Sequence, residues 1–176
     1  MSYHINMVNG YVYSCYASPV GNLYIAAGAK GITDLGIGVK EGDFLAGLAS
    51  SQTIEPAFDN GRFSVLFRLL DEYFKGRPVV FSVPLNPSGT AFDRVVWNAL
   101  SAIPWGGKLS YGEVASVIGK PGAARAVGGA CGRNPIPIIV PCHRVLQSGG
   151  FIGGYSGGEG VKEKLLALEG IPFKAR

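Results

Sequence analysis

The chain has 176 residues, of which 47% are hydrophobic and 16% are charged, a composition that excludes a disordered polymer. No apolar run approaches the roughly 20 residues of a membrane-spanning helix. The first residues lack the basic start and apolar core of a signal peptide, so a cytoplasmic protein of one domain or two small ones is expected.

The formal net charge of +4 is divided unevenly along the chain. Residues 1–88 hold six Lys or Arg and seven Asp or Glu, whereas residues 89–176 hold ten and five. A basic second half favours contact with a polyanion, although a device for solubility would give the same imbalance.

Three cysteines occur, at positions 15, 131 and 142, and their odd number and irregular spacing exclude a disulfide framework. The two histidines are His4 and His143. Cys15 and His4 have no matching second pair of ligands, so no structural zinc site is expected. One functional thiol in a reducing compartment fits this usage better.

Short alternating apolar runs, separated by Gly and Pro, predict strands of a small antiparallel sheet in the first half. These runs cover residues 11–13, 23–27 and 32–37. Apolar residues at helical spacing then predict a helix over residues 65–74, which Gly76 and Pro78 end. One more strand is expected over residues 79–83.

A cluster of Pro, Ser and Gly marks a boundary between an N-terminal domain, residues 1–87, and a C-terminal domain, residues 88–176. The next apolar face predicts a helix over residues 92–103, capped by Ser88 or Thr90. The expected fold class is therefore α+β, a small antiparallel sheet with a helix followed by a mostly helical domain.

Two short helices joined by a Gly-containing turn follow, which fits a helix-turn-helix. Ser110 and Glu113 form a capping box for the first, over residues 111–118, and the second covers residues 123–131. Many helical proteins contain such corners, so this pattern alone leaves DNA binding open.

The second of these helices contains two adjacent glycines, Gly128 and Gly129, each of which costs about 1 kcal/mol relative to alanine. Small residues let another backbone approach closely, such as that of a nucleic acid. The alternative is tight packing against the core, with Arg125 in solvent.

Three prolines between residues 135 and 141 exclude a helix and predict an extended, stiff and buried path. Cys142 follows directly, beside His143 and Arg144. An imidazole, a guanidinium and a helix N-terminus at this point would each favour the thiolate and lower the pKa of Cys142.

Side chains adjacent in sequence rarely bond directly, so His143 is expected to reach Cys142 through a water molecule. Glu169, at the end of a helix predicted over residues 161–169, is the candidate to orient the imidazole. This Cys-His-Glu relay suits a thiol hydrolase and other cysteine nucleophiles equally.

A glycine-rich loop covers residues 149–158 and lacks the Lys-Ser/Thr ending of a phosphate-binding loop. Its main-chain groups could line a pocket for a flat ring, with Tyr155 as a wall. A flexible surface loop is the alternative interpretation.

The run Pro141-Cys142-His143-Arg144-Val145 resembles the signature of the O6-alkylguanine-DNA alkyltransferases. Further family motifs occur in family order through the second half: Ser110-Tyr111, Ala124 to Ala130, Asn134-Pro135, Tyr155 to Gly158, Lys162-Glu163 and Leu168 to Gly170. The first half resembles the family, whose N-terminal domain is RNase H-like, only in size and in its β-then-helix pattern.

This resemblance implies an irreversible, single-turnover transfer of the alkyl group from O6 of guanine, and from O4 of thymine, to Cys142. His143 would be the water-mediated base, Glu169 would orient it, and Asn134 would hold the active-site turn. The partner would be double-stranded DNA carrying O6-alkylguanine, bound by a monomer without cofactor, metal or membrane. The protein would be nucleoid-associated in a prokaryote and nuclear in a eukaryote.

The resemblance also implies how the damaged nucleotide is flipped out through the minor groove. Tyr111 would help push the nucleotide out, and Arg125 would fill the hole. The carbonyl of Val145 would accept from the guanine amino group, while Tyr155 and Ser156 would cover the base. The positions that match contacts to the DNA backbone are Lys120, Gly112 and Ser148.

Two other classes of protein share parts of this pattern. Alkyltransferase-like proteins have the scaffold without the cysteine, so Cys142 argues against a non-catalytic DNA binder. A thiol hydrolase has no need of Arg125 on a glycine-bearing helix. A regulatory role, as in fused relatives, needs a sensing domain for which the chain has no room. Cys131 stands where relatives often carry another small or apolar residue, and no role is assigned to it.

Overall fold

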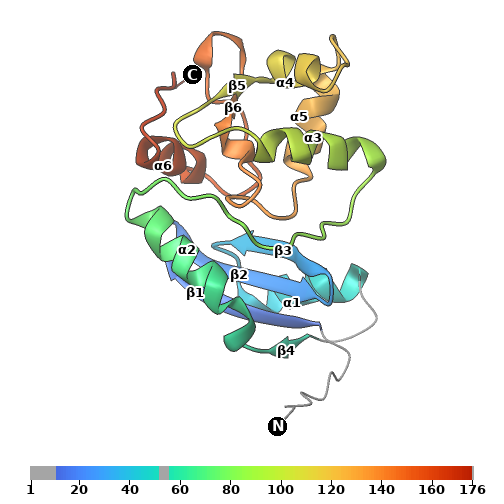
Figure 1. The fold of residues 1–176 in the computed structure, drawn as a ribbon, viewed down its shortest axis with the longest axis vertical. Helices are drawn as coiled ribbons and strands as arrows, with labels where there is room; N and C mark the ends of the chain where they lie inside the picture. The colour runs from blue at the N-terminus through green and yellow to red at the C-terminus, as the bar shows by residue number, and fades with distance from the viewer. Residues whose placement is uncertain (1–10, 52–55, 176) are drawn as a thin grey trace.

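A computed structural model describes residues 11–51 and 56–175. The expected α+β fold is confirmed: Figure 1 shows a twisted sheet with two helices and, above it, a mostly helical part. None of the helices in these ranges is long and apolar enough to cross a membrane. The division into domains at residues 87 and 88 stays a prediction.

The predicted sheet is confirmed, with strand order β3-β2-β1-β4. The first three strands pair antiparallel, but the two-residue β4 runs parallel to β1, with Val12 opposite Ala57, so the sheet is not wholly antiparallel. The strands are β1 (Val12–Ser18), β2 (Gly21–Gly28), β3 (Gly31–Ile37) and β4 (Ala57–Phe58).

Two helices cover opposite faces of this sheet (Figure 1). The predicted helix is α2 (Ser64–Phe74), which follows a 3-10 turn η1 (Gly61–Phe63) and packs with Leu23 and Ile25 of β2. The second helix, α1 (Glu41–Ser51), was not predicted, and it packs through Leu48 against Ala26.

The strand expected over residues 79–83 is wrong, because this segment forms no ladder with the sheet. The chain meets β3 just beyond it, where the amide of Ile32 donates to the carbonyl of Pro84 at 2.9 Å and the amide of Asn86 donates to that of Ile32 at 2.7 Å. Pro84 and Pro87 have no amide hydrogen, which limits the pairing to this single bridge.

The second half contains the four predicted helices, and these predictions are confirmed. Thr90, rather than Ser88, caps the first, and Ser110 caps the second, each in a capping box with Asp93 or Glu113. The helices are α3 (Ala91–Ser101), α4 (Tyr111–Val117), α5 (Ala124–Gly132) and α6 (Val161–Leu168).

A two-stranded parallel sheet links the helix-turn-helix, α4 and α5, to the reactive segment. It joins β5 (Leu109–Ser110) to β6 (Val145–Leu146), with Leu109 opposite Val145. Since α4 begins directly after β5, and β6 follows the short helical turn η2 (Cys142–Arg144), this pairing brings the start of α4 beside Cys142.

The extended path expected through residues 135–141 is also wrong. The chain reverses there, because the amide of Val140 bonds the carbonyl of Ile136 at 2.9 Å and Ile138 takes a positive φ of 73°. The prolines exclude a helix, as expected, but they fix φ without preventing a turn. The segment is buried, and the carbonyl of Pro135 accepts from the amide of Leu35 in β3 at 2.7 Å.

Candidate active site

Cys142 begins the helical turn η2 and is only 4% exposed. Its side chain lines a pocket of about 270 Å³ that lies between the two helices of the helix-turn-helix and the glycine-rich loop. The prediction that this loop borders a pocket beside the cysteine is therefore confirmed. The pocket is lined by Tyr111, Gly128, Cys131, Gly132, Cys142, Gly154, Tyr155 and Ser156.

Asn134 holds the turn that carries Cys142. Its Nδ2 atom donates to the carbonyl of Val140 at 2.8 Å and lies 3.2 Å from Sγ of Cys142, while its Oδ1 accepts from the amide of Ile136 at 3.0 Å. One buried amide side chain therefore ties the two ends of the turn together and places a hydrogen-bond donor on the sulfur.

His143 is not among the residues that line the pocket, and its imidazole contacts Glu169, just beyond the end of α6. Its Nε2 lies 2.8 Å from Oε1 of Glu169, and the imidazole is fully buried. Nδ1 is also buried and has no hydrogen-bond partner within the described ranges. The structure thus brings together the predicted pair of imidazole and carboxylate.

The sequence led us to expect the guanidinium of Arg144 beside the thiol of Cys142, but Arg144 does not face Cys142. Its guanidinium binds Glu169, from Nε to Oε2 at 2.7 Å and from Nη2 to Oε1 at 3.0 Å, and Nη1 donates to the carbonyl of Ile103. Burial acts to raise the pKa of Glu169, but the hydrogen bonds and charges of His143 and Arg144 outweigh it and lower that pKa to about 2. Glu169 is therefore ionised at neutral pH.

The expected low pKa of Cys142 is not found. Burial raises the pKa of the thiol, and the bond from Asn134, the charge of Lys162 and the backbone amides of Cys142 and His143 offset this only in part. Burial likewise lowers the pKa of His143, more than Glu169 raises it. The resting site thus holds a neutral thiol beside a neutral imidazole, so the thiol needs a base when it reacts.

Lys162 is a functional candidate that the sequence reasoning noted only as part of a motif. It is 1% exposed on α6, and its Nζ donates to the carbonyl of Val145 at 2.7 Å. Its charge lowers the pKa of Cys142, while burial lowers its own. A lysine at the first turn of an amphipathic helix gave no signal that it would be buried.

Tyr111 and Tyr155 form two walls of the pocket. Tyr111 starts α4 and lies along Gly128, where an added Cβ would come within 3.8 Å of its ring. Burial, with the charges of Cys131 and Cys142, raises the pKa of Tyr111 to about 12. The hydroxyl of Tyr155 is buried and has no hydrogen-bond partner in the described part of the chain.

The other predicted contacts divide into buried and exposed groups. Val145 is buried, and Lys162 already bonds its carbonyl, which keeps a second lone pair free. Ser156 is exposed at the pocket. The residues expected to touch DNA are all exposed: Arg125 on α5, Lys120 in the turn before it, Gly112 on α4, and Ser148, which begins the turn η3 (Ser148–Gly150).

The two remaining cysteines differ in their surroundings. Cys131 is 7% exposed and lines the same pocket as Cys142, and burial raises the pKa of its thiol to about 12. Cys15 is half-buried in β1. His4, weighed above as a zinc ligand, lies outside the described residues. Residues 11–51 and 56–175 contain no group of three or more His, Cys, Asp or Glu that could hold a metal.

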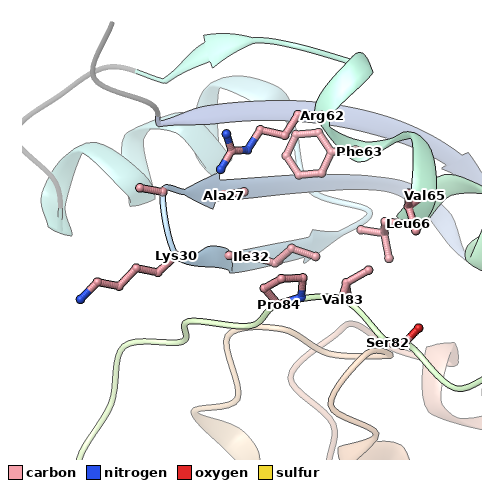
Figure 2. A pocket seen from close by; sticks show the side chains of 12 residues that line it. Ala27, Lys30, Ile32, Arg62, Phe63, Val65, Leu66, Ser82, Val83 and Pro84 are labelled. Carbon is pink, nitrogen blue, oxygen red and sulfur yellow. The ribbon is translucent and has the colours of Figure 1, made fainter. Parts of the chain in front are cut away.

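A larger pocket, of about 430 Å³, lies between the hairpin of β2 and β3, the start of α2 and residues 82–84 (Figure 2). Its floor is apolar, formed by side chains such as Ile32, Phe63 and Leu66. Figure 2 shows the amino group of Lys30 pointing away from them. No cysteine, histidine or carboxylate lines this pocket, so the chemistry belongs to the one at Cys142.

A thiol, an imidazole and an orienting carboxylate form the arrangement of a cysteine-dependent enzyme, here set beside a helix-turn-helix. Two family models match the chain: the ribonuclease-like domain of 6-O-methylguanine DNA methyltransferase over residues 11–87, and the DNA binding domain of the same protein over residues 91–171. The chain therefore belongs to the 6-O-methylguanine DNA methyltransferase family.

Individual relatives agree with this assignment. A methylated-DNA--protein-cysteine methyltransferase of Methanosarcina acetivorans is 42% identical over 90% of this chain and 97% of its own length. One of Mycobacterium tuberculosis is 44% identical over 89% of this chain and 91% of its own.

Solved structures are similar as well. The crystal structure of Mycobacterium tuberculosis O6-methylguanine methyltransferase has a TM-score of 0.77 and 42% identity, covering 90% of this chain and 92% of that chain. The crystal structure of Mycobacterium tuberculosis OGT in complex with DNA has a TM-score of 0.78 and 43% identity, covering 89% and 91%.

Proposed function

We propose that this protein repairs double-stranded DNA, as a monomer, by moving the alkyl group on O6 of guanine to Sγ of Cys142. One observation carries the proposal: Cys142 lines a pocket whose other walls come from the helix-turn-helix and the glycine-rich loop. A nucleophile in that place can meet a base only if the base leaves the duplex and enters the pocket. Family membership and the names of the relatives support the same reaction.

The proton of the Cys142 thiol goes to His143 in this proposal. Glu169 is ionised and can only accept, so Nε2 of His143 carries the ring hydrogen and Nδ1 keeps its lone pair. One water molecule between Nδ1 and Sγ would relay the proton. The raised pKa of the thiol requires such a base.

The transfer itself is a displacement at the alkyl carbon. A C–S bond forms as the C–O6 bond breaks, and the electron pair of that bond leaves with guanine, which takes up a proton to restore the normal base. The thiol proton stays on His143 until solvent removes it. The thioether is stable, so each molecule reacts once and no cofactor is needed.

The damaged nucleotide reaches the pocket by rotation through the minor groove, against which α5 lies. Arg125, exposed on α5, fills the space that the nucleotide leaves, and Tyr111 helps to push it out and contacts its base. Unstacking and unpairing cost a few kcal/mol, which stacking and hydrogen bonds in the pocket offset.

The glycines of α5 favour the close approach of a molecule outside the chain. An added Cβ at Gly128 would make only ordinary contact with Tyr111, and at Gly129 it would meet the flexible end of Arg133 at 3.1 Å. Packing within the chain therefore does not demand glycine at either position. A DNA backbone lying close to the helix supplies the missing reason.

Further residues hold the base and the strand. The carbonyl of Val145 accepts from the guanine amino group with the lone pair that Lys162 leaves free. Tyr155 and Ser156 cover the base, and a main-chain amide of their loop bonds O6. Contacts to the DNA backbone come from Lys120, Gly112 and Ser148. The same displacement on O4-alkylthymine would follow the same path.

The test is the fate of the lesion. A duplex with one O6-methylguanine is incubated with increasing protein, then digested to nucleosides, which are counted. We expect one lesion to become guanine for each protein molecule, no conversion by Cys142→Ala, and full conversion by the matched control Cys15→Ala. Repair by Cys142→Ala, or release of free base or nucleoside in place of repair, would overturn the proposal.

A further inference from the structure

One buried side chain of α2 reaches the relay at Cys142. Tyr73 lies in the last turn of α2, on the N-terminal sheet, and none of its surface is exposed. Its hydroxyl donates to Oε1 of Glu169 at 2.7 Å and lies 3.5 Å from Nε2 of His143. The first half of the chain therefore contacts the carboxylate that orients the imidazole.

Aromatic packing fixes the direction of this hydroxyl. The ring of Tyr73 meets Trp105 edge-on, with centroids 5.2 Å apart and planes at 80°, and it meets Phe74 in the same way at 5.2 Å and 86°. Phe81 packs on it at 5.6 Å. Because these contacts involve the ring alone, a phenylalanine would keep them and lose only the hydroxyl.

Three donors converge on one oxygen of Glu169. Oε1 accepts from Tyr73, from Nε2 of His143 and from Nη2 of Arg144, while Oε2 accepts from Nε of Arg144. The Tyr73 hydroxyl can donate only one hydrogen, and the ionised carboxylate takes it. This bond fixes the position of the atom that the imidazole must face.

We propose that Tyr73 is a positioning residue of the alkyl-transfer reaction, whose hydroxyl holds Oε1 of Glu169 against His143 and so keeps Nδ1 as the proton-accepting atom. The inference rests on the function proposed above. It gives the N-terminal half a part in the chemistry besides support, because Tyr73 acts on Cys142 through Glu169 and His143.

Removing the hydroxyl changes the balance of charge at the imidazole. Without this donor, the negative charge of Glu169 is stabilised by one hydrogen bond fewer. The carboxylate then attracts the protonated imidazole more strongly, so the pKa of His143 rises. The charged or titratable groups that face His143 are Glu169, Arg144, Lys162, Cys142, Tyr73 and, near Glu169, Tyr155. Tyr73→Phe alters one of them.

The experiment measures the single-turnover rate of methyl transfer from a short duplex, across a range of pH. Three full-length proteins are compared: the natural chain, Tyr73→Phe and Tyr16→Phe. Tyr16 is a matched control, since its hydroxyl also donates to a carboxylate of α2, Asp71 at 2.7 Å, but in an exposed place away from the pocket. Urea unfolding of each protein is measured in parallel.

We expect Tyr73→Phe to transfer about tenfold more slowly, and its rate to begin falling at a higher pH on the acid side. Tyr16→Phe should match the natural chain in both respects. An unchanged rate and acid limb in Tyr73→Phe would overturn the inference, and so would a slower rate with an unshifted limb, which marks a structural role. Absence of transfer by the natural chain would instead refute the proposed function.

Discussion

Arg144 and Glu169 form a buried ion pair in which the guanidinium contacts both carboxylate oxygens, at 2.7 and 3.0 Å. Arg144 follows the nucleophile by two positions, yet its charge serves the carboxylate and not the sulfur. The pair keeps Glu169 ionised, and Glu169 in turn fixes the tautomer of His143. The pKa of Cys142 is lowered instead by Asn134 and by Lys162 of α6, against the larger effect of burial.

Glu169→Gln should cost about 3–5 kcal/mol of the free energy of unfolding, because it leaves Arg144 buried without its counter-charge. It should also slow transfer at least 100-fold, because the amide can turn its NH2 group toward Nε2 of His143, and that group cannot accept the ring hydrogen. Urea unfolding and single-turnover rates check both effects. The exposed swap Asp71→Asn is the control and should change stability by less than about 0.5 kcal/mol. A loss below about 1 kcal/mol in Glu169→Gln would contradict the assignment.

Stability should fall in acid in two stages. The pKa of His143 is lowered in the folded state, so the unfolded chain takes up more protons and stability drops as pH falls below the ordinary value of 6.5. The pKa of Glu169 is lowered to about 2, so its contribution is complete above its ordinary 4.5 and is lost as pH falls toward 2. Urea midpoints between pH 8 and pH 3 measure this, and a flat profile would refute it.

Asn134→Ala should raise the pKa of Cys142 further, because it removes the donor that lies 3.2 Å from Sγ. It also leaves the carbonyl of Val140 and the amide of Ile136 without their side-chain partner. Each loss should lower the free energy of unfolding by about 1–3 kcal/mol. Modification of Cys142 by iodoacetamide, followed against pH and read on its own peptide, measures the pKa. An unchanged profile would show that Asn134 does not act on the sulfur.

Arg125→Ala should slow repair of duplex DNA by tenfold or more but leave the reaction with free O6-benzylguanine within about twofold. The arginine acts on the nucleotide's exit from the duplex, which a free base does not need. Lys164→Ala, which removes a cation from α6, is the matched control. Equal losses on both substrates in Arg125→Ala would assign Arg125 to the pocket instead.

The sequence predicted those elements that carry strong local signals. The capping box at Ser110 indicated where one helix begins, and the need for a group to orient the imidazole led to Glu169 as the partner of His143. The helix α1 was missed because it contains Gly42 and Gly47, and its only large apolar residues, Phe44, Leu45 and Leu48, are too few to show a clear helical period.

Other features depend on tertiary contacts that no local pattern encodes. The reversal at Ile138 needs a positive φ that a β-branched residue seldom takes, so the prolines around it indicated an extended path. Arg144 turns toward Glu169 because the fold buries both. Tyr73 belongs to an ordinary amphipathic helix, and only the packing of α2 under α6 brings its hydroxyl to Glu169.

Cys142 as the acceptor of the alkyl group is tested by the mass of the intact protein before and after incubation with a short duplex that carries one O6-methylguanine. Transfer to the protein predicts a gain of about 14 Da, the mass of one methylene, in a single step, and digestion should place it on the peptide that contains Cys142. An unchanged mass, or the same gain on a peptide containing Cys131 or Cys15, would contradict the assignment of Cys142 as the acceptor.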